Sequence, residues 1–426
     1  MSGRAVVLGL GRFGGGLGAA NHLVRLGFDV TVTDAAPADE LTDAAHRLAP
    51  EARRVFGGHE GIGVADTDLL VVNPAVPTPW QHPLVRDADR AGVRITTEIG
   101  LLLDELAEPG TAAHGSAAVV GITGTAGKST TAAMLHAGLT AAGRRCVLGG
   151  NIGGSLLDRV EELAAAEVVV LELSSAMLWW LGRPLSCRTP PAFDIGAITN
   201  LAPNHIDWHG AFDHYAESKG VLARLAKRAL IVGDDTAWKT DAPVVRPAPL
   251  AGDLALPGHH NRVNAALAVE ACRTLAVEAD AGVRAFSGLP HRLKLVHTSR
   301  RGTRYIDDSK CTTPQATRLA VESVLGEGAV HLIAGGYDKH VDLAELADAA
   351  RACNAAWLIG ETAKRLARAR AGTDIETLDA AVRRAAESVP GGGTVLLSPG
   401  CASWDQFADY RERGERFCKL AVEHDP

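Results

Sequence analysis

Residues 119–131 read VVGITGTAGKSTT, an apolar run that ends in glycines and continues as Lys-Ser-Thr-Thr. The pattern predicts a buried strand, a glycine loop and the start of a helix, in that order. The first amides of a helix have no partner within the helix, and the helix dipole favours anions there. The sequence therefore predicts that a triphosphate binds to the loop from Gly124 to Thr130.

The residue types in this loop suit a P-loop. Lys128 supplies a point charge for the β- and γ-phosphates, and the hydroxyl of Ser129 or Thr130 is a ligand for Mg²⁺. The usual spacing needs a glycine at position 122, where this chain has Ile122, so the motif is the shorter TGTxGK[ST]T form. A chance Lys-Ser pair in a glycine-rich turn is the alternative, and the order of strand, loop and helix argues against it. The expected nucleotide contacts in the loop are Gly124, Thr125, Ala126, Gly127, Lys128, Ser129 and Thr130.

Composition limits the class of protein. The chain has 426 residues, of which 46% are hydrophobic, enough for several buried cores and about three domains. A net charge of −7 and the lack of any Lys/Arg run argue against nucleic-acid or membrane-surface binding. The 7 cysteines show no CxxC spacing, which favours reduced thiols. No apolar stretch approaches the roughly 20 residues of a spanning helix, and we expect a soluble cytoplasmic protein.

Residues 1–108 predict a Rossmann-like domain. A strand from Arg4 leads into the glycine pattern of residues 9–14, and a second strand ends at Asp34, as in a dinucleotide-binding fingerprint. On its own this pattern fits an NAD(P)-dependent oxidoreductase or a domain of this fold without that cofactor. A later strand, 68–72, leads into Asn73-Pro74-Ala75, a second place for a ligand. Residues 108–116 are rich in Pro, Gly and Ala and predict a linker.

Residues 117–284 predict a parallel sheet with helices on both faces. The strand 168–171 is followed by Glu172, whose carboxylate is expected to bind Mg²⁺ beside the phosphate loop; a surface glutamate is the alternative. The strand 195–198 leads into a loop that contains His205 and Asp207. These two side chains either bind a metal or reacting group, or are structural.

The chain also resembles the Mur ligase family. The similarity lies in GITGTAGKSTT, in GGNIG at 149–153, in ELSS at 172–175, in NLAPNHIDWHG with Tyr215 and Lys219, and in residues 253–264, 288–292, 307–310 and 398–403. These runs span nearly the whole chain in order. The resemblance implies an α/β protein of three domains: an N-terminal Rossmann-like domain that binds a UDP-sugar, a central P-loop domain that binds ATP, and a C-terminal Rossmann-like domain, residues 285–426, that binds an amino acid.

The resemblance further implies an ATP-dependent amide ligase. In such an enzyme ATP phosphorylates a carboxylate to an acyl phosphate, which an amine then attacks. Because the carboxylate and the γ-phosphate are both anionic, bringing them together requires Mg²⁺ and cationic groups. The implied substrates are UDP-N-acetylmuramoyl-L-alanine and D-glutamate, in peptidoglycan biosynthesis, and the implied protein is a cytoplasmic monomer without nucleic-acid or membrane partners.

The resemblance assigns roles to individual residues. The catalytic groups would be Lys128, His205, Lys219 and Lys310. One Mg²⁺ would lie on Ser129 or Thr130 and Glu172, and a second on His205 and Lys219. A plain lysine repels a cation, so this role of Lys219 depends on its carbamylation; a solvated lysine is the alternative. The other nucleotide contacts would be Asn264, Arg292 and Asp308.

Two further sets of residues would contact the substrates. The set for the UDP group is Arg12, Phe13, Asp34 and Asn73, and Asn151 and Ser174 are further substrate contacts. The set for the amino acid lies in loops that follow strands of the third domain: Thr312, Lys339, Ser403, Trp404 and Tyr410. Lys339 would pair with the side-chain carboxylate of the amino acid, with a solvated lysine as the alternative.

Several positions depart from the family pattern, and they leave other functions open. Ala126 replaces an asparagine, Trp208 an arginine and Trp404 a leucine; Met177, Thr313 and His340 also differ. The alternatives are a ligase of this family that adds another amino acid, a nucleotide-binding paralogue without catalysis, and the NAD(P)-dependent oxidoreductase. The retained catalytic groups favour activity.

Overall fold

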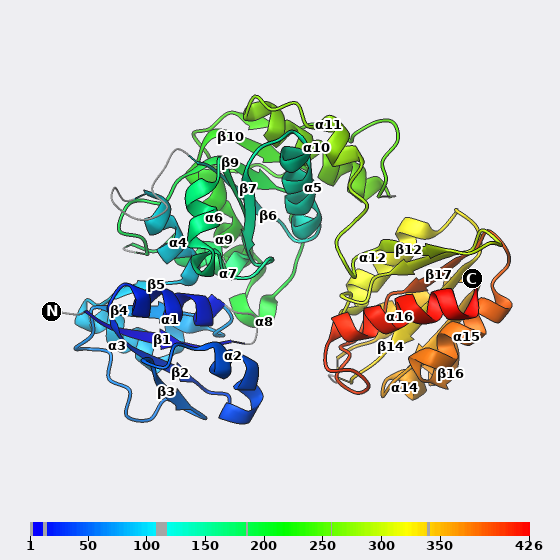
Figure 1. The fold of residues 1–426 in the computed structure, drawn as a ribbon, viewed down its shortest axis with the longest axis horizontal. Coiled ribbons are helices and arrows are strands. Elements are labelled where there is room, and N and C mark those ends of the chain that lie inside the picture. The colour runs from blue at the N-terminus through cyan, green and yellow to red at the C-terminus, as the bar shows by residue number, and fades with distance from the viewer. Residues whose placement is uncertain (1–2, 12–14, 108–116, 185, 257, 339–340) are drawn as a thin grey trace. The chain divides into compact units, whose positions relative to one another are not determined.

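The computed structural model describes residues 3–11, 15–107, 117–184, 186–256, 258–338 and 341–426. These residues form three sheets, which run from blue through green to red along the chain in Figure 1. The first two sheets belong to one compact unit, residues 1–251 with 263–283, and the third belongs to a second unit, residues 252–262 with 284–426. The α/β class and the three-domain architecture expected from the sequence are confirmed.

The first sheet is parallel, with the strand order β3-β2-β1-β4-β5. Because the order reverses between β1 and β4, the loops that follow these two strands border one crevice, the usual ligand site of such sheets. The elements are β1 (Arg4–Leu8), α1 (Gly15–Arg25), β2 (Asp29–Asp34), η1 (Ala38–Leu41), α2 (Thr42–Arg47), β3 (Arg53–Phe56), β4 (Leu69–Val72), η2 (Pro79–Gln81), α3 (Pro83–Ala91), β5 (Arg94–Thr96) and α4 (Glu98–Ala107).

The second sheet is also parallel, with the order β11-β10-β9-β6-β8-β7. Since β6 lies between β9 and β8, the loops after these three strands meet at one edge. The elements are β6 (Ala118–Thr123), α5 (Lys128–Ala141), β7 (Cys146–Gly150), η3 (Leu156–Asp158), α6 (Val160–Ala165), β8 (Val168–Glu172), α7 (Ser175–Leu181), β9 (Phe193–Ile198), α8 (Ile206–His209), α9 (Phe212–Leu225), β10 (Ala226–Val232), β11 (Val244–Val245), α10 (His259–Thr274) and α11 (Asp280–Arg284).

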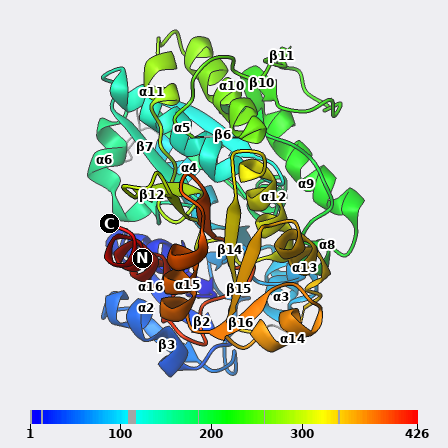
Figure 2. The ribbon, with the colours of Figure 1, turned by 90° about the vertical axis from the view of Figure 1, so that its right-hand side faces the viewer.

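The third sheet has the order β12-β13-β17-β14-β15-β16 and is mixed, because β12 runs antiparallel to β13. Figure 2 shows α12 and α13 on one side of its strands and α15 and α16 on the other, which matches the two separate apolar clusters. The elements are β12 (Lys294–Thr298), β13 (Arg304–Asp307), α12 (Pro314–Val324), β14 (Val330–Gly335), α13 (Ala344–Arg351), β15 (Ala355–Ile359), α14 (Ala363–Arg368), β16 (Thr373–Glu376), α15 (Leu378–Ser388), β17 (Thr394–Leu397) and α16 (Tyr410–His424).

The first two sheets share their apolar interior. One cluster includes Leu17 of α1 and Leu171 of β8, and another joins Leu70 of the first sheet to Trp180 of α7. Polar contacts cross the same junction: Arg183 donates two hydrogen bonds to the carboxylate of Asp89. The nucleotide-sugar and phosphate loops expected from the sequence are therefore held on one rigidly packed body.

Several strands escaped the sequence prediction, among them the edge strands β3 and β12. β3 has the sequence RRVF, with both arginines exposed, and β12 is KLVHT with no fully buried residue. Edge strands such as these lack the continuous apolar run that marks a buried parallel strand. The predicted linker, 108–116, lies outside the described residues. Within the described part of the chain, no helix combines the length and apolar character needed to cross a bilayer.

Candidate active site

The predicted phosphate loop connects β6 to α5, as expected, and glycine is required at two of its positions. Gly124 and Gly127 have φ angles of +147° and +82°, which side chains rarely adopt. A Cβ on Gly124 would overlap Oγ1 of Thr199, and one on Gly127 would overlap Oδ1 of Asn264. The loop is therefore in close contact with the β9 loop and with α10, the helix that carries the predicted nucleotide contact Asn264.

The loop that follows β9 holds the phosphate loop in place. The side-chain amide of Asn200 makes two hydrogen bonds with the backbone of Ala126. The Ala126 amide donates to Oδ1 (3.0 Å), and Nδ2 donates to the Ala126 carbonyl (3.1 Å). The Thr125 amide donates to the Asn200 carbonyl, and the Thr125 hydroxyl bonds to the backbone of Ala202. Sequence reasoning assigned no role to Asn200, which lies two residues after the end of β9, a neighbour of the P-loop strand β6.

Two lysines donate hydrogen bonds to carbonyl oxygens of the phosphate loop. Lys128 Nζ donates to the carbonyl oxygen of Thr125 (3.0 Å), and Lys219 Nζ donates to that of Gly124 (2.7 Å). Lys219 is only 1% exposed. Burial, together with the charge of Lys128, lowers the pKa of Lys219 well below its usual value, and the opposing effect of Glu172 is smaller. The site therefore disfavours the charged form of Lys219 relative to a lysine in water.

The arrangement around Glu172 fits a divalent cation. Glu172 is the last residue of β8, is 1% exposed, and accepts a hydrogen bond at Oε1 from Nδ2 of Asn151 (3.0 Å). Its Oε2 is buried without a hydrogen-bond partner among the described residues. A carboxylate oxygen in that state costs free energy unless a cation approaches it. Hard oxygen ligands of this kind suit Mg²⁺, which commonly keeps waters and phosphate oxygens in its shell. The described residues contain no group of three His, Cys, Asp or Glu side chains placed to hold a metal unaided.

His205 precedes the short helix α8. It is exposed and has a φ angle of +51°, and the Asn204 side chain accepts a hydrogen bond from its amide. A non-glycine residue in this conformation is often held there for function. Of the other predicted residues in this region, Ser174 caps α7 by accepting from the Met177 amide.

In the first sheet, Asp34 and Asn73 border the same glycine loop. The Asp34 carboxylate accepts a hydrogen bond from the Gly11 amide (3.2 Å), and the Asn73 side chain donates to the Gly9 carbonyl (3.3 Å). Both residues therefore shape the loop itself, whatever they contribute to a ligand. The predicted contacts Arg12 and Phe13 lie outside the described residues.

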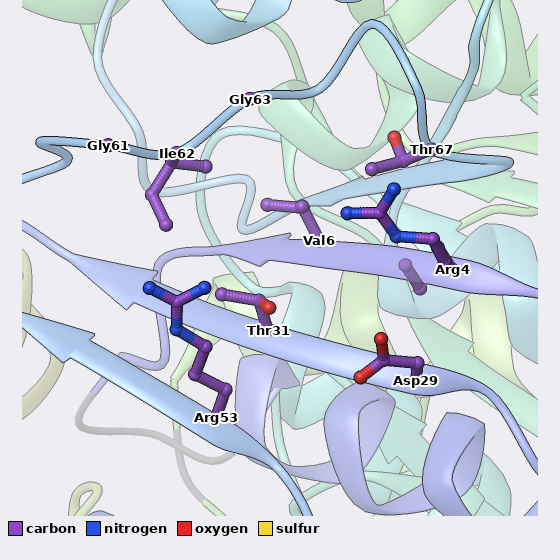
Figure 3. A pocket seen from close by; sticks show the side chains of 10 residues that line it. Arg4, Val6, Asp29, Thr31, Arg53, Gly61, Ile62, Gly63 and Thr67 are labelled. Carbon is purple, nitrogen blue, oxygen red and sulfur yellow. The ribbon is translucent and has the colours of Figure 1, made fainter.

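A pocket of about 130 Å³ lies elsewhere on this sheet (Figure 3). Among its lining residues are Arg4, Asp29 and Arg53, the first residues of β1, β2 and β3, whereas the glycine loop and Asn73 follow the last residues of their strands. The side chains of Arg4 and Arg53 lie on either side of Thr31 in Figure 3. None of the predicted site residues lines this pocket, so it is separate from the candidate active site.

The third sheet brings several predicted residues to one edge. Asp308 accepts hydrogen bonds from Ser398 Oγ (2.8 Å) and from the Leu293 amide (3.2 Å). Burial raises the pKa of Asp308 to about 7, although these hydrogen bonds act in the opposite direction. Lys310 Nζ lies 5.3 Å from the centre of the Tyr410 ring, which supports a cation–π contact.

The remaining predicted amino-acid contacts differ in exposure. Ser403 is 2% exposed and Thr312 is half-buried, whereas Trp404 is 54% exposed and packs against Tyr337 with ring centres 5.6 Å apart. Lys339 and His340 lie outside the described residues.

The predicted contact Arg292 lies in a strained loop that leads into β12. Its neighbours His291 and Leu293 have φ angles of +60° and +44°. His291 Nδ1 lies 2.7 Å from the buried carboxylate of Asp307, which fixes the loop to the end of β13. Sequence reasoning missed this pair, because the two residues are 16 positions apart and meet only through the antiparallel pairing of β12 with β13.

Models of three protein domains match the chain. A Mur ligase MurD-like N-terminal domain matches residues 3–97, a Mur ligase middle domain residues 122–247, and a Mur ligase glutamate ligase domain residues 291–401. The chain belongs to the Mur ligase family. The predicted family is thus confirmed, and the glycine fingerprint of residues 9–14 is that of a MurD-like N-terminal domain.

Among curated relatives, the UDP-N-acetylmuramoylalanine–D-glutamate ligase of Sphingopyxis alaskensis is 37% identical, over 99% of this chain and 97% of that protein. The protein of the same name from Rubrobacter xylanophilus is 35% identical, over 98% of each chain. Among solved structures, a MurF ligase from Thermotoga maritima in complex with ADP has a TM-score of 0.53 at 15% identity, over 99% of this chain and 97% of that one. At that identity the likeness supports the fold alone.

Proposed function

We propose that this protein is an ATP-dependent ligase that joins D-glutamate to UDP-N-acetylmuramoyl-L-alanine. The observation that carries the proposal is the full-length similarity to D-glutamate ligases, at up to 37% identity in the relatives named above. The phosphate loop also keeps Lys128, Ser129 and Thr130. The loop and Glu172 lie at the ends of neighbouring strands β6 and β8 of one sheet. A nucleotide and a carboxylate substrate are both anions, and this edge offers amides, Lys128 and a cation site to hold them.

The proposed reaction has two steps. An oxygen of the alanyl carboxylate attacks the γ-phosphorus of ATP, and the bond from that phosphorus to the β-phosphate oxygen breaks to release ADP. The amine of D-glutamate then attacks the acyl carbon, loses a proton, and displaces inorganic phosphate, which retains the oxygen donated by the carboxylate. The phosphate-loop amides and Lys128 hold the γ-phosphate while its charge is redistributed.

We assign one Mg²⁺ to Glu172 Oε2 and the hydroxyls of Ser129 or Thr130. When bound, the ion neutralises charge between the phosphates and the substrate carboxylate. The unpartnered Oε2 of Glu172 supports this assignment. The Asn151 side chain, bonded to the other carboxylate oxygen, orients Glu172 for it.

We further propose that Lys219 is carbamylated and, with His205, holds a second metal ion. Only a neutral amine reacts with carbon dioxide, forming a nitrogen–carbon bond and losing a proton. Burial lowers the pKa of Lys219 and so favours the neutral amine more than water does. The modification replaces a group that repels cations with a carboxylate that binds them.

The remaining substrate contacts are proposed from the family pattern. Asp34, Asn73, Asn151 and Ser174, with Arg12 and Phe13, are proposed to contact the UDP-sugar. Asn264, Arg292, Asp308 and Lys310 are proposed to contact the nucleotide. Thr312, Lys339, Ser403, Trp404 and Tyr410 are proposed to hold the incoming amino acid. A monomeric state and a cytoplasmic location also belong to the proposal.

The decisive assay is phosphate release with ATP, Mg²⁺ and UDP-N-acetylmuramoyl-L-alanine against a panel of D- and L-amino acids. We expect release that depends on D-glutamate and on the sugar nucleotide together. L-Glutamate provides the matched control, since it differs only in configuration. Turnover with another amino acid and none with D-glutamate would contradict the proposed specificity but not the ligase chemistry.

A further inference from the structure

Trp208 connects the first two sheets through a single hydrogen bond. It lies in α8, and its indole Nε1 donates to the carbonyl oxygen of Val76 at 3.0 Å. Val76 belongs to the loop after β4, which also contains Asn73, a proposed contact of the UDP-sugar. α8 begins directly after His205, the proposed metal ligand. One indole nitrogen thus joins the segment that follows His205 to the loop that would hold the sugar nucleotide.

The Trp208 indole is enclosed by aromatic rings from both sheets. The Trp80 ring in η2 lies 5.4 Å from it at an interplanar angle of 87°, and the Trp179 ring in α7 lies 5.8 Å from it at 77°. Trp208 is 9% exposed. Edge-to-face packing of this kind fixes the ring plane, and the exclusion of water strengthens the hydrogen bond that it makes.

Each partner of this bond is separately fixed to its own sheet. The Asn73 amide donates to Leu8, and the Val76 amide donates back to Asn73, so the loop rests on β1. At the other end, the imidazole of His209 in α8 lies 2.9 Å from Ser175 Oγ and 2.9 Å from the His214 ring nitrogen. His209 therefore fastens α8 to the second sheet, and Trp208 fastens it to the first.

We propose that Trp208 is a positioning residue that sets where the UDP-sugar loop lies relative to His205. The inference rests on the proposed function. The first sheet would hold the UDP group of the substrate, and the second sheet would hold the γ-phosphate that the substrate carboxylate must reach. An error in the spacing between these sheets would therefore misplace the carboxylate relative to the γ-phosphate. The bond from Trp208 to Val76 fixes that spacing at the point where the two ligand segments meet.

Two variants isolate the bond. Trp208→Phe keeps an aromatic ring and removes the N–H donor. Replacing Trp208 with 3-benzothienylalanine keeps the size and shape of the indole and removes only the donor. The matched control is Trp180→Phe, because Trp180 packs in the same junction but its Nε1 has no hydrogen-bond partner among the residues that the structure describes. Thermal unfolding of each variant checks that it is folded.

Two measurements decide the inference. First, we expect amide hydrogen exchange at residues 73–76 to become about tenfold faster in both Trp208 variants, as for the loss of one buried hydrogen bond. Exchange in the phosphate loop should stay the same, and Trp180→Phe should leave residues 73–76 unchanged. Second, we expect the KM for the UDP-sugar to rise about tenfold in the Trp208 variants, while the KM for ATP changes less than twofold.

Unchanged exchange at residues 73–76 in the benzothienylalanine variant would overturn the inference, as would equal rises in the two KM values. The exchange measurement needs no turnover. If the wild-type protein failed to use the UDP-sugar, the proposed function would be wrong. Amide hydrogen exchange at residues 73–76 would still decide whether Trp208 holds the loop after β4.

Discussion

The side-chain amide of Asn200 pairs with both backbone groups of Ala126, through hydrogen bonds of 3.0 and 3.1 Å. The pairing resembles one rung of a β-ladder, with a side chain in place of the second strand. It fixes the orientation of the peptide plane at Ala126, in the middle of the phosphate loop. The phosphate loop and the loop that leads to His205 are therefore one connected structure, which links the proposed sites for ATP and for the second metal.

Replacing Asn200 should weaken ATP binding. In Asn200→Ala both hydrogen bonds to Ala126 are lost, and we expect the KM for ATP to rise by about 10–100-fold, from roughly 1 kcal/mol for each bond. The KM for the amino acid should change little, because its proposed contacts lie on another sheet. Steady-state kinetics with each substrate varied in turn measures both constants. Equal changes in the KM for ATP and the KM for the amino acid would show that the variant acts through general loss of structure.

Lys128→Ala should abolish turnover. Lys128 is the proposed cation for the γ-phosphate, and we expect kcat to fall by about 10²-fold or more, as when a single group that stabilises developing charge is removed. ADP formation measures the effect. Lys227→Ala, a change at an exposed lysine of β10, provides the control and should leave kcat unchanged. An unchanged rate in Lys128→Ala would disprove the role given to the phosphate loop.

Lys219→Ala should lose activity that short carboxylic acids partly restore. The variant removes the amine that is proposed to carry a carboxylate, and formate or acetate can enter the space and supply one. We expect a loss of at least about 10²-fold, with recovery that increases with the concentration of acid. Mass spectrometry of the wild-type protein in bicarbonate tests the modification directly. Full activity of Lys219→Ala without added acid would rule out the modified lysine.

Glu98 should make the stability of the first unit depend on pH. Its carboxylate accepts a hydrogen bond from Ser155 (2.7 Å), and burial raises the pKa of Glu98 to about 7 from a usual value of 4.5. The folded state holds the proton more tightly than the unfolded state, so this contribution to stability is present at low pH and is lost as the pH rises to about 7.

Glu98→Gln keeps the size of the side chain and removes the titration. Between pH 5 and pH 8, we expect the wild type to lose about 2 kcal/mol more unfolding free energy than Glu98→Gln does, from the size of the pKa shift. Urea unfolding at the two pH values measures the difference. Parallel pH profiles for the two proteins would contradict the assigned pKa.

The sequence determined the central strands because their apolar runs are continuous. β4 and β8 are buried on both faces, and their ends lie within a residue of those expected. The phosphate loop was predicted equally well from its glycines, because Gly124 and Gly127 occupy backbone conformations that favour glycine. Edge strands such as β3 are short and begin with two exposed arginines, so their pattern is that of a loop.

The contacts that position the site could not be predicted in the same way. The bond from Trp208 to Val76 joins residues 132 positions apart, and its geometry depends on how two sheets pack. The lowered pKa of Lys219 likewise follows from burial near Lys128, and no local pattern in the sequence indicates it. Motifs thus supplied the candidate residues of the site, whereas the tertiary structure was needed to find the groups that contact them.

The origin of the oxygen in the released phosphate tests the proposed chemistry most directly. UDP-N-acetylmuramoyl-L-alanine labelled with ¹⁸O in its alanyl carboxylate is incubated with the protein, ATP, Mg²⁺ and D-glutamate, and the phosphate is analysed by mass spectrometry. The account predicts one ¹⁸O atom in each phosphate molecule formed, because the carboxylate oxygen leaves with phosphorus from the acyl phosphate. Product formation with unlabelled phosphate would contradict it.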